Sequence, residues 1–190
     1  VVHILQEITR QAGSEIVKRI RGISISSQTV TMLPVDRDGE PLRNALIWMD
    51  SRSAEELNYI IASIGFDQLV SIIGAQPDVA FLPNKLLWFR KNEPQRFAKT
   101  HKILQASSFI NYKLTGNMSM DIDQAVRSQC LDLKKMQWSD EIARVIGVDF
   151  NAILPDLKLT TEVIGTVSDQ AASETGLISG IPVIAGASDA

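Results

Sequence analysis

The sequence predicts a mixed α/β fold with a helical insertion in its middle. Segments with the character of strands, residues 22–35 and 163–185, flank a region, residues 51–146, in which apolar residues recur at three- and four-residue steps. No repeat, low-complexity tract or long linker interrupts the 190 residues. That length suits one domain or at most two small ones, so we expect residues 1–190 to form a single domain.

The first part of the chain combines one helix with short strands. Apolar residues within 2–20 recur at helical spacing and predict an amphipathic helix that continues through Gly13. Three short apolar or β-branched segments follow: 22–27, 30–35 and 45–48. Residues 36–41 between them are dense in turn formers. This order predicts an antiparallel β unit after the helix.

The middle of the chain is predicted to be helical, with Ser51 as the N-cap of its first helix. The predicted helices cover residues 54–64, 66–73, 85–91, 107–114, 122–131 and 140–146. A loop begins at Pro155. It leads to a strand at 163–167, a helix capped by Ser168 and closed by Gly176, and a last buried strand at 181–185.

Charge and composition exclude several classes of protein. Nineteen basic and twenty-two acidic side chains give a net charge of −3, which argues against a nucleic-acid partner. Cys130 has no second cysteine to pair with, and His3 and His101 are too few to complete a zinc site around it. Neither a signal peptide nor an apolar run of the ~20 residues that span a bilayer is visible. We therefore expect a cytoplasmic protein that binds small molecules and no membrane.

Two polar segments follow predicted strands. Residues 26–29 lie at a strand end, where α/β folds place ligand groups, and Gln28 offers donors and an acceptor for a pair of hydroxyls. A hydrogen-bonded turn is the alternative. At the second segment, Asp50 could accept from sugar hydroxyls while Trp48 covers an apolar sugar face. Alternatively, Asp50 and Arg52 pair with each other and cap the next helix.

Two further segments carry carboxylates. Asp121 and Asp123 have no further oxygen ligands at calcium-loop spacing, so we interpret them as acids at a helix start and predict no metal site. Asp189 follows a buried strand and small residues, an arrangement that suits a general base, although a turn aspartate is the alternative. No GxxxxGK or GxGxxG phosphate loop occurs, so a kinase would need phosphate contacts from outside this chain.

Eight short motifs occur in one order along nearly the whole chain. They are Gly22-Ile23-Ser24 to Gln28, Asp36 to Arg43, Trp48-Met49-Asp50-Ser51-Arg52, Pro83 to Trp88, Tyr112 to Gly116, Asp121 to Asp132, Trp138-Ser139-Asp140 and Thr175-Gly176-Leu177. In this order the motifs resemble the N-terminal lobe of the FGGY carbohydrate kinases, the family of xylulokinase, glycerol kinase and gluconokinase. Each motif is weak alone, and together they are a strong signal.

The resemblance implies an actin-like, ribonuclease H-like fold and phosphorylation of a sugar, polyol or sugar acid by ATP with Mg²⁺, in a protein that often forms a homodimer. It identifies Asp189 with the family's catalytic aspartate, the group that takes the proton from the attacking hydroxyl. The implied sugar pocket comprises Gln28, Thr29, Val30, Trp48, Asp50, Phe81 and Phe109. Contacts to ATP are expected outside this chain.

The sequence also departs from the family pattern. Thr29 and Val30 stand where xylulokinases carry Met-His and glycerol kinases carry Arg-Glu, which argues against glycerol and against ordinary D-xylulose specificity. Residues 186–189, Gly-Ala-Ser-Asp, are closer to what gluconokinases carry, and we expect a five- or six-carbon ketose or sugar acid as substrate. Ala187 and Ser188 replace glycines before the proposed base, and Ala190 replaces the usual amide. The family's opening β-hairpin and its C-terminal ATP-binding lobe are not within these residues.

We therefore expect a fragment of a longer kinase that is inactive by itself. The alternatives are a non-catalytic sugar-binding or sensor module of the same fold, and an actin-like structural domain that binds protein.

Overall fold

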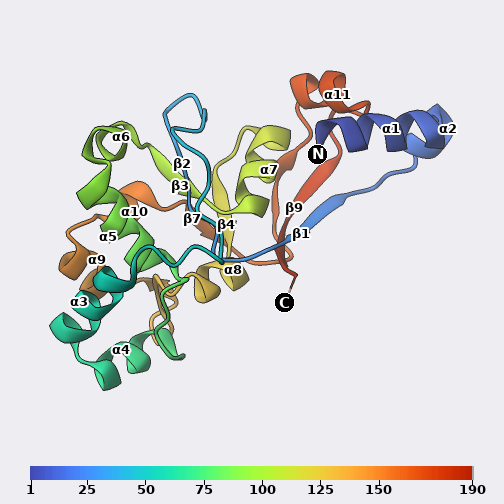
Figure 1. Cartoon of the computed structure of the whole chain (residues 1–190). Coiled ribbons are helices and arrows are strands. Elements are labelled where there is room, and N and C mark those ends of the chain that lie inside the picture. The colour runs from blue at the N-terminus through green and yellow to red at the C-terminus, as the bar shows by residue number, and fades with distance from the viewer. Residues whose placement is uncertain (190) are drawn as a thin grey trace.

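A three-stranded sheet organises one part of the molecule in the computed structural model, which describes residues 1–189. Its central strand is β9 (Pro182–Ser188), which runs parallel to β1 (Ile23–Ser27) and antiparallel to β8 (Val163–Thr166). β1 and β9 therefore end at the same edge of the sheet, and Figure 1 shows them side by side. This edge is where the polar residues 26–29 and Asp189 follow their strands.

Helices pack around this sheet and enclose a small apolar core. The helices are α1 (Val2–Ala12), α2 (Ser14–Val17), α7 (Ala106–Thr115) and α11 (Asp169–Thr175). α7 lies against β1 and β9, while α1 contacts α11 (Figure 1). Val167, Val183 and Ala185 are among the buried residues of this core. The helix expected over 2–20 breaks at Gly13, whose φ of 76° is incompatible with a continuous helix.

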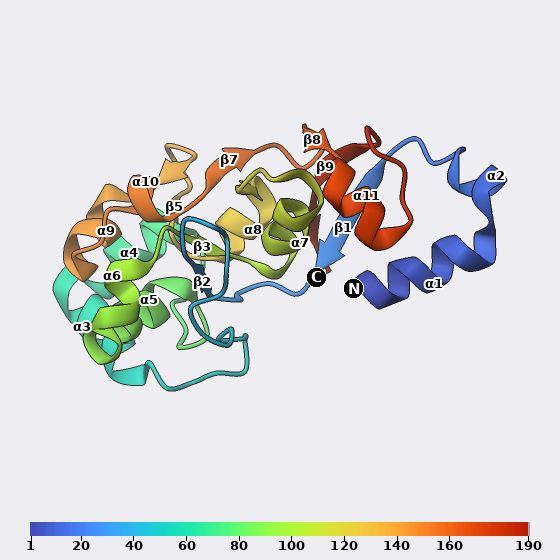
Figure 2. The ribbon, with the colours of Figure 1, turned by 90° about the horizontal axis from the view of Figure 1, so that it is seen from above.

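The second part of the molecule is mostly helical and extends to one side of the sheet (Figure 2). It contains α3 (Ala54–Ile64), α4 (Phe66–Ile73), α5 (Leu82–Asn92), α6 (Pro94–Lys99), α9 (Asp140–Ile146) and α10 (Phe150–Ile153). Leu86, Phe89 and Ile142 are fully buried in its core. Burial of each such side chain contributes about 1.5–3 kcal/mol, so this core can position the segments that lead to the sheet.

Short strand pairs and one helix connect the two parts. β2 (Leu33–Val35) pairs antiparallel with β3 (Lys102–Leu104), β4 (Ser119–Asp121) pairs parallel with β7 (Asp156–Lys158), and β5 (Leu131–Asp132) pairs antiparallel with β6 (Gln137–Trp138). α8 (Ile122–Arg127) begins directly after β4 and contacts β9. Its first turn is therefore close to the sheet edge where β9 ends.

Most predicted helices are confirmed by the structure. The segments 66–73 and 140–146 coincide with α4 and α9, and the Oγ of Ser168 accepts from the N–H of Ala171 as a helix cap. α6 was not expected, because Pro94 was interpreted only as the end of a helix. Pro94 instead occupies the first turn of α6, where its missing N–H leaves no bond unmade.

Three expectations were wrong. The segments 22–48 do not form an antiparallel unit, since β1 pairs with β9 and β2 with β3, and residues 45–48 contribute only an isolated bridge between Leu46 and Met32. The helix α3 has Ser53, not Ser51, as its N-cap. The helix expected over 122–131 ends at Arg127.

The antiparallel unit fails because neighbouring strands in the chain take distant partners. Local alternation indicates an extended segment but not its partner, and here β1 pairs with β9 and β2 with β3. Val30, between β1 and β2, has a φ of 61°, a conformation that β-branched residues rarely adopt.

Among the described residues, no single helix has the length and hydropathy needed to cross a membrane. The pair α3 and α4 reaches that length only together, and it bends by 99° at Gly65.

Candidate functional site

The candidate site lies where β1 and β9 end together. Their pairing shifts between Ser24 and Ser26, and Gly186 occupies the shift with a φ of 88°. A Cβ on Gly186 would lie 2.2 Å from the carbonyl oxygen of Ile25, so only glycine allows this approach. The N–H of Asp189 donates to the Ser27 carbonyl at 3.0 Å, which fixes the backbone of an otherwise exposed aspartate at the sheet edge.

The first turn of α8 also contributes a side chain to this edge of the sheet. Asp123 Oδ2 accepts from the N–H of Ser188 at 2.9 Å and also from the Ser188 hydroxyl, and its Oδ1 accepts from Arg127 Nε at 3.1 Å. Partial burial opposes ionisation, but the hydrogen bonds from Ser188 and then Arg127 hold the pKa of Asp123 below its ordinary value. An ionised Asp123 therefore holds the residue that precedes Asp189.

Gln124 connects α8 to the end of β1. Its Nε2 lies 3.4 Å from the Ser27 carbonyl, the Ser27 hydroxyl and the Gln28 carbonyl. The Oε1 of Gln124 is buried, and no described group donates to it. The ends of β1 and β9 and the start of α8 thus form one polar cluster around the backbone of Asp189.

Asp121 has the structural role expected of it, because its Oδ1 accepts from the N–H of Gln124 at 2.8 Å and caps α8. Burial raises the pKa of Asp121 to about 6, and the bond from Gln124 opposes this shift. Nowhere in residues 1–189 do three His, Cys, Asp or Glu side chains gather in a group that could hold a metal ion.

The segment after β1 is held by side chains as well as by the sheet. Gln28 Nε2 donates to the Thr31 hydroxyl at 3.1 Å, and the N–H of Thr31 donates to Gln105 Oε1 at 2.7 Å. Gln28 is therefore engaged by a side chain of its own segment, which has a bend at residue 29. Thr29 remains partly exposed, whereas Val30 is buried.

The segment 47–50 is a turn that presents an aromatic ring. The N–H of Asp50 donates to the Ile47 carbonyl at 3.0 Å, and the Trp48 between them is 53% exposed. Both carboxylate oxygens of Asp50 accept from Arg52 Nε, at 2.8 and 3.0 Å, and the Arg52 guanidinium lies 4.8 Å from the ring centre of Trp88. Asp50 is therefore already paired with Arg52, as the alternative interpretation expected. The capping role in that interpretation was wrong, because Ser53 is the N-cap of α3 and no described side chain caps this helix.

The charge of Asp50 follows from the same contacts. Burial favours its neutral form, but the hydrogen bonds and charge of Arg52 hold the pKa of Asp50 below its ordinary value. What this segment offers a ligand is an ion pair beside an exposed tryptophan, not a lone carboxylate.

Lys85 joins these two segments and was not singled out from the sequence. It is fully buried in α5, and its Nζ donates to the Val30 carbonyl at 3.0 Å and to the Ile47 carbonyl at 2.8 Å. Burial lowers the pKa of Lys85 to about 8, against the opposing charges of Asp50 and Asp78. The available signal was a lysine within a mostly apolar run, residues 82–89, in which Asn84 is the other polar residue.

The two predicted phenylalanines lie in different surroundings. Phe81 is the N-cap of α5 and is partly buried. Phe109 lines an apolar hollow that is shared with Val1 and Leu5 of the N-terminal segment, and none of the other candidate residues is among the described residues of that lining. The structure thus does not bring Phe109 into the polar cluster at Asp189.

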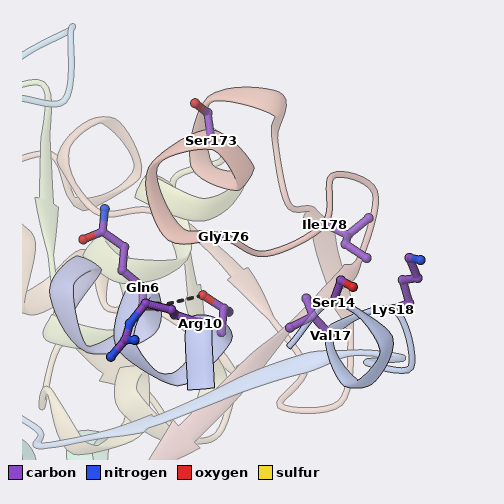
Figure 3. Close-up of a pocket in the computed structure, with 9 residues that line it drawn as sticks. Gln6, Arg10, Ser14, Val17, Lys18, Ser173, Gly176 and Ile178 are labelled. Atoms are coloured by element: carbon purple, nitrogen blue, oxygen red, sulfur yellow. Dashed lines mark hydrogen bonds between the residues drawn. The ribbon is translucent and has the colours of Figure 1, made fainter. Parts of the chain in front are cut away.

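A hollow of about 540 Å³ lies away from the candidate site, between α1, α2 and α11 (Figure 3). Arg10 and Lys18 are the basic residues in its lining, and each already pairs with a glutamate of its own helix, Glu7 and Glu15, at 2.7 Å. Its lining contains none of the candidate residues among those that the structure describes. We therefore assign it no part in the candidate site.

Comparison with known proteins shows which family this chain belongs to. The model of the FGGY family of carbohydrate kinases, N-terminal domain, matches residues 1–190. The chain belongs to the FGGY family of carbohydrate kinases. The resemblance inferred from the eight motifs is thereby confirmed.

Two curated relatives illustrate the extent of the FGGY match. The L-fuculokinase of Escherichia coli K12 is 34% identical over 181 residues, which are 95% of this chain and 38% of the relative. The xylulose kinase of Lactococcus lactis is 30% identical over 176 residues, which are 93% of this chain and 35% of the relative. The chain thus spans little more than a third of the length of these relatives.

Solved structures confirm the fold of this FGGY domain. A xylulose kinase from Rhodospirillum rubrum superposes with a TM-score of 0.91 at 25% identity, over 97% of this chain and 38% of the other. A Plasmodium falciparum glycerol kinase with ADP superposes with a TM-score of 0.85 at 23% identity, over 99% of this chain and 38% of the other, a likeness of fold alone. The expected actin-like, ribonuclease H-like fold is confirmed.

Proposed function

We propose that this chain is the sugar-binding lobe of an ATP-dependent carbohydrate kinase, with Asp189 as its catalytic base. The observation that carries the proposal is the position of Asp189, exposed at the sheet edge where β1, β9 and α8 converge. Membership of a family of carbohydrate kinases supports the reaction type. We further propose that a nucleotide-binding lobe lies elsewhere in a longer polypeptide. The isolated chain is therefore expected to transfer no phosphate at a useful rate.

In the proposed reaction, the Asp189 carboxylate accepts the proton of a substrate hydroxyl. The hydroxyl oxygen forms a bond to the γ-phosphorus of ATP as the bond from that phosphorus to the bridging oxygen breaks, and ADP leaves with the electron pair. The backbone bonds that hold Ser188 and Asp189 keep the base in place, which lowers the entropic part of the barrier.

Mg²⁺ is expected with the nucleotide rather than in a site of this lobe. Residues 1–189 contain no cluster of ligands for a metal ion, and Mg²⁺ is usually held by one or two carboxylates together with phosphate oxygens and water. We therefore assign none of the described residues to Mg²⁺.

The substrate class that we propose is a five- or six-carbon ketose or sugar acid. We include Gln28, Thr29, Val30 and Trp48 in the proposed sugar pocket. Thr29 offers a partly exposed hydroxyl and Trp48 an exposed ring, whereas the Gln28 amide is bonded to Thr31 and Val30 is buried. The paired Asp50 and Arg52 would contact substrate together. Use of ATP and a single buried cysteine, Cys130, are typical of a cytoplasmic enzyme, which we include in the proposal. The homodimer stays a prediction.

A second candidate function is a sugar-binding or sensor module without catalysis. Ala187 and Ser188 favour it, because they replace glycines of the family pattern next to the proposed base. Nucleotide affects the sugar-bound state of a kinase but not that of a sensor. Only a kinase needs Asp189 for turnover.

The first test is a thermal-shift screen of the full-length protein with D-xylulose, L-fuculose, D-gluconate and glycerol, each with and without Mg-ATP. A ligand that binds only the folded state raises Tm. A shift with one sugar that increases with nucleotide supports the kinase, and a shift indifferent to nucleotide supports the sensor. No shift with any of these compounds contradicts the proposed substrate class.

The second test replaces Asp189 by asparagine in the full-length protein. Loss of a general base lowers kcat by roughly 10²- to 10⁴-fold, with little change in sugar affinity. Asp67→Asn is the matched control, since Asp67 is an exposed carboxylate in the first turn of α4. Turnover by Asp189→Asn equal to that of the Asp67 control would rule out the proposed base.

A further inference from the structure

Two of the candidate binding segments, residues 28–31 and 47–50, lie on either side of β2 in the chain and are held together at two points. One point is the bridge in which Met32 and Leu46 exchange both main-chain hydrogen bonds, at 2.8 and 3.0 Å. The other is Lys85, whose ammonium group donates to one carbonyl of each segment. A side chain from α5 thus connects the two candidate binding segments.

Burial of the Lys85 ammonium group costs free energy unless its hydrogen bonds compensate for the lost hydration. The residue is fully buried, as are Leu82, Leu86 and Phe89 of the same helix. A buried cation loses the hydration that stabilises it in water, and here it bonds main-chain carbonyls rather than a carboxylate. An apolar side chain of the same length would fill this space without that penalty, so packing alone does not explain a lysine.

Each of the two carbonyls belongs to a backbone feature that needs support. Val30 has a φ of 61°, a strained conformation for a β-branched residue. The Ile47 carbonyl begins the turn that exposes Trp48, and it also accepts from the N–H of Asp50. Lys85 therefore contacts the strained residue of one segment and the first residue of the turn in the other.

We propose that Lys85 is a positioning residue that clamps segments 28–31 and 47–50 into the geometry required for sugar binding. The inference rests on the proposed function, because it concerns the same site. It predicts that loss of the ammonium group weakens sugar binding through the backbone of both segments, without any contact between Lys85 and the sugar.

The chain offers a matched control for this test. Lys102 Nζ also donates to two main-chain carbonyls, those of Ala152 and Leu154, at 2.9 and 2.8 Å, and it lies in β3, outside both segments. Lys85→Met and Lys102→Met each remove one ammonium group and two hydrogen bonds. A general effect of lost bonds on the fold would appear in both variants.

Hydrogen exchange on the full-length protein tests the clamp without any ligand. In Lys85→Met we expect the amides of both segments to exchange at least ten-fold faster. In Lys102→Met the faster exchange is expected in residues 151–155 instead. Unchanged exchange of segments 28–31 and 47–50 in a folded Lys85→Met chain would overturn the proposal.

Sugar affinity tests the consequence for binding. With whichever of D-xylulose, L-fuculose or D-gluconate binds the full-length protein, we expect Kd to rise at least ten-fold in Lys85→Met and less than two-fold in Lys102→Met. Equal affinities in Lys85→Met and the unmodified full-length protein would overturn the clamp. If none of the three sugars binds the unmodified full-length protein, the proposed substrate class fails, while hydrogen exchange still decides whether Lys85 holds both segments.

If Lys85→Met does not fold, a measurement on the unmodified full-length protein tests whether Lys85 responds to sugar binding. Carbon-13 NMR of the lysine Cε atoms reports each ammonium group separately. Saturating sugar is expected to shift the Lys85 signal and to leave the Lys102 signal in place. A Lys85 signal that does not respond to a bound sugar would contradict the proposal.

Discussion

Replacement of Gly186 by alanine tests the close approach of β1 and β9 that brings Asp189 to the candidate site. Gly186 has a φ of 88°, and its added Cβ would lie 2.2 Å from the Ile25 carbonyl oxygen and 3.1 Å from the carbonyl carbon. The obstacle is backbone of the neighbouring strand, so no side-chain rotation relieves it. The two strands must separate, and the end of β9 moves with them.

The size of the effect follows from two separate contributions. A residue with a Cβ at positive φ loses about 1–2 kcal/mol relative to glycine. Overpacking in a well-packed region adds typically 1–3 kcal/mol. We therefore expect Gly186→Ala to lower the free energy of unfolding by roughly 2–5 kcal/mol, a large share of the 5–15 kcal/mol typical of a domain.

Gly180 supplies a control with the same backbone conformation and open space. Its φ is 87°, and no described atom lies within 4 Å of an added Cβ. Gly180→Ala should therefore show only the first contribution, about 1–2 kcal/mol. The assay is urea unfolding of the three chains, followed by circular dichroism. Equal losses in the two variants would refute the close approach of β1 and β9 at Gly186.

The remaining predictions concern three buried or half-buried groups. Because the pKa of Asp121 is raised to about 6, the folded chain binds a proton more tightly than the unfolded chain, and stability falls as pH rises from about 4 to 6. Asp121→Asn keeps an oxygen for the helix cap and should remove this fall. In urea unfolding, the free energy of unfolding of the variant relative to the unmodified chain should then be higher at pH 7.5 than at pH 4 by roughly 1–2 kcal/mol. The same difference between the two chains at both pH values would refute this prediction. Asp123→Ala leaves the N–H of Ser188 without its carboxylate acceptor and should lower the free energy of unfolding by about 1–3 kcal/mol, with a loss below 0.5 kcal/mol speaking against that contact. Burial raises the pKa of Cys130 well above its usual range, so a thiol reagent such as Ellman's should modify it only in urea, and rapid reaction of the native chain would contradict its burial.

Local sequence pattern was sufficient to predict a helix when the residues that start, space and end it all lie within that helix. The helix α9 begins after Ser139, whose Oγ accepts from the N–H of Ile142, and it ends at Gly147, which adopts the left-handed conformation. The cap, the apolar spacing and the final glycine all lie within the element. Helices of this kind were predicted with their bounds nearly correct.

Strand pairing could not be predicted in the same way. β1 finds its partner β9 about 160 residues later, and β2 pairs with β3 nearly 70 residues later. Local alternation indicates that a segment is extended, but it does not indicate which edge it pairs with. The antiparallel unit was therefore wrong although two of its strands exist.

The sequence by itself determined the family, the mixed α/β class and the candidate base Asp189, because motifs and periodicity are properties of neighbouring residues. Only the tertiary structure decided which groups meet at the site. It placed Asp123 against Ser188, paired Asp50 with Arg52, and brought buried Lys85 to both binding segments. These contacts join residues of separate elements, and their bonds form only when packing brings those elements together.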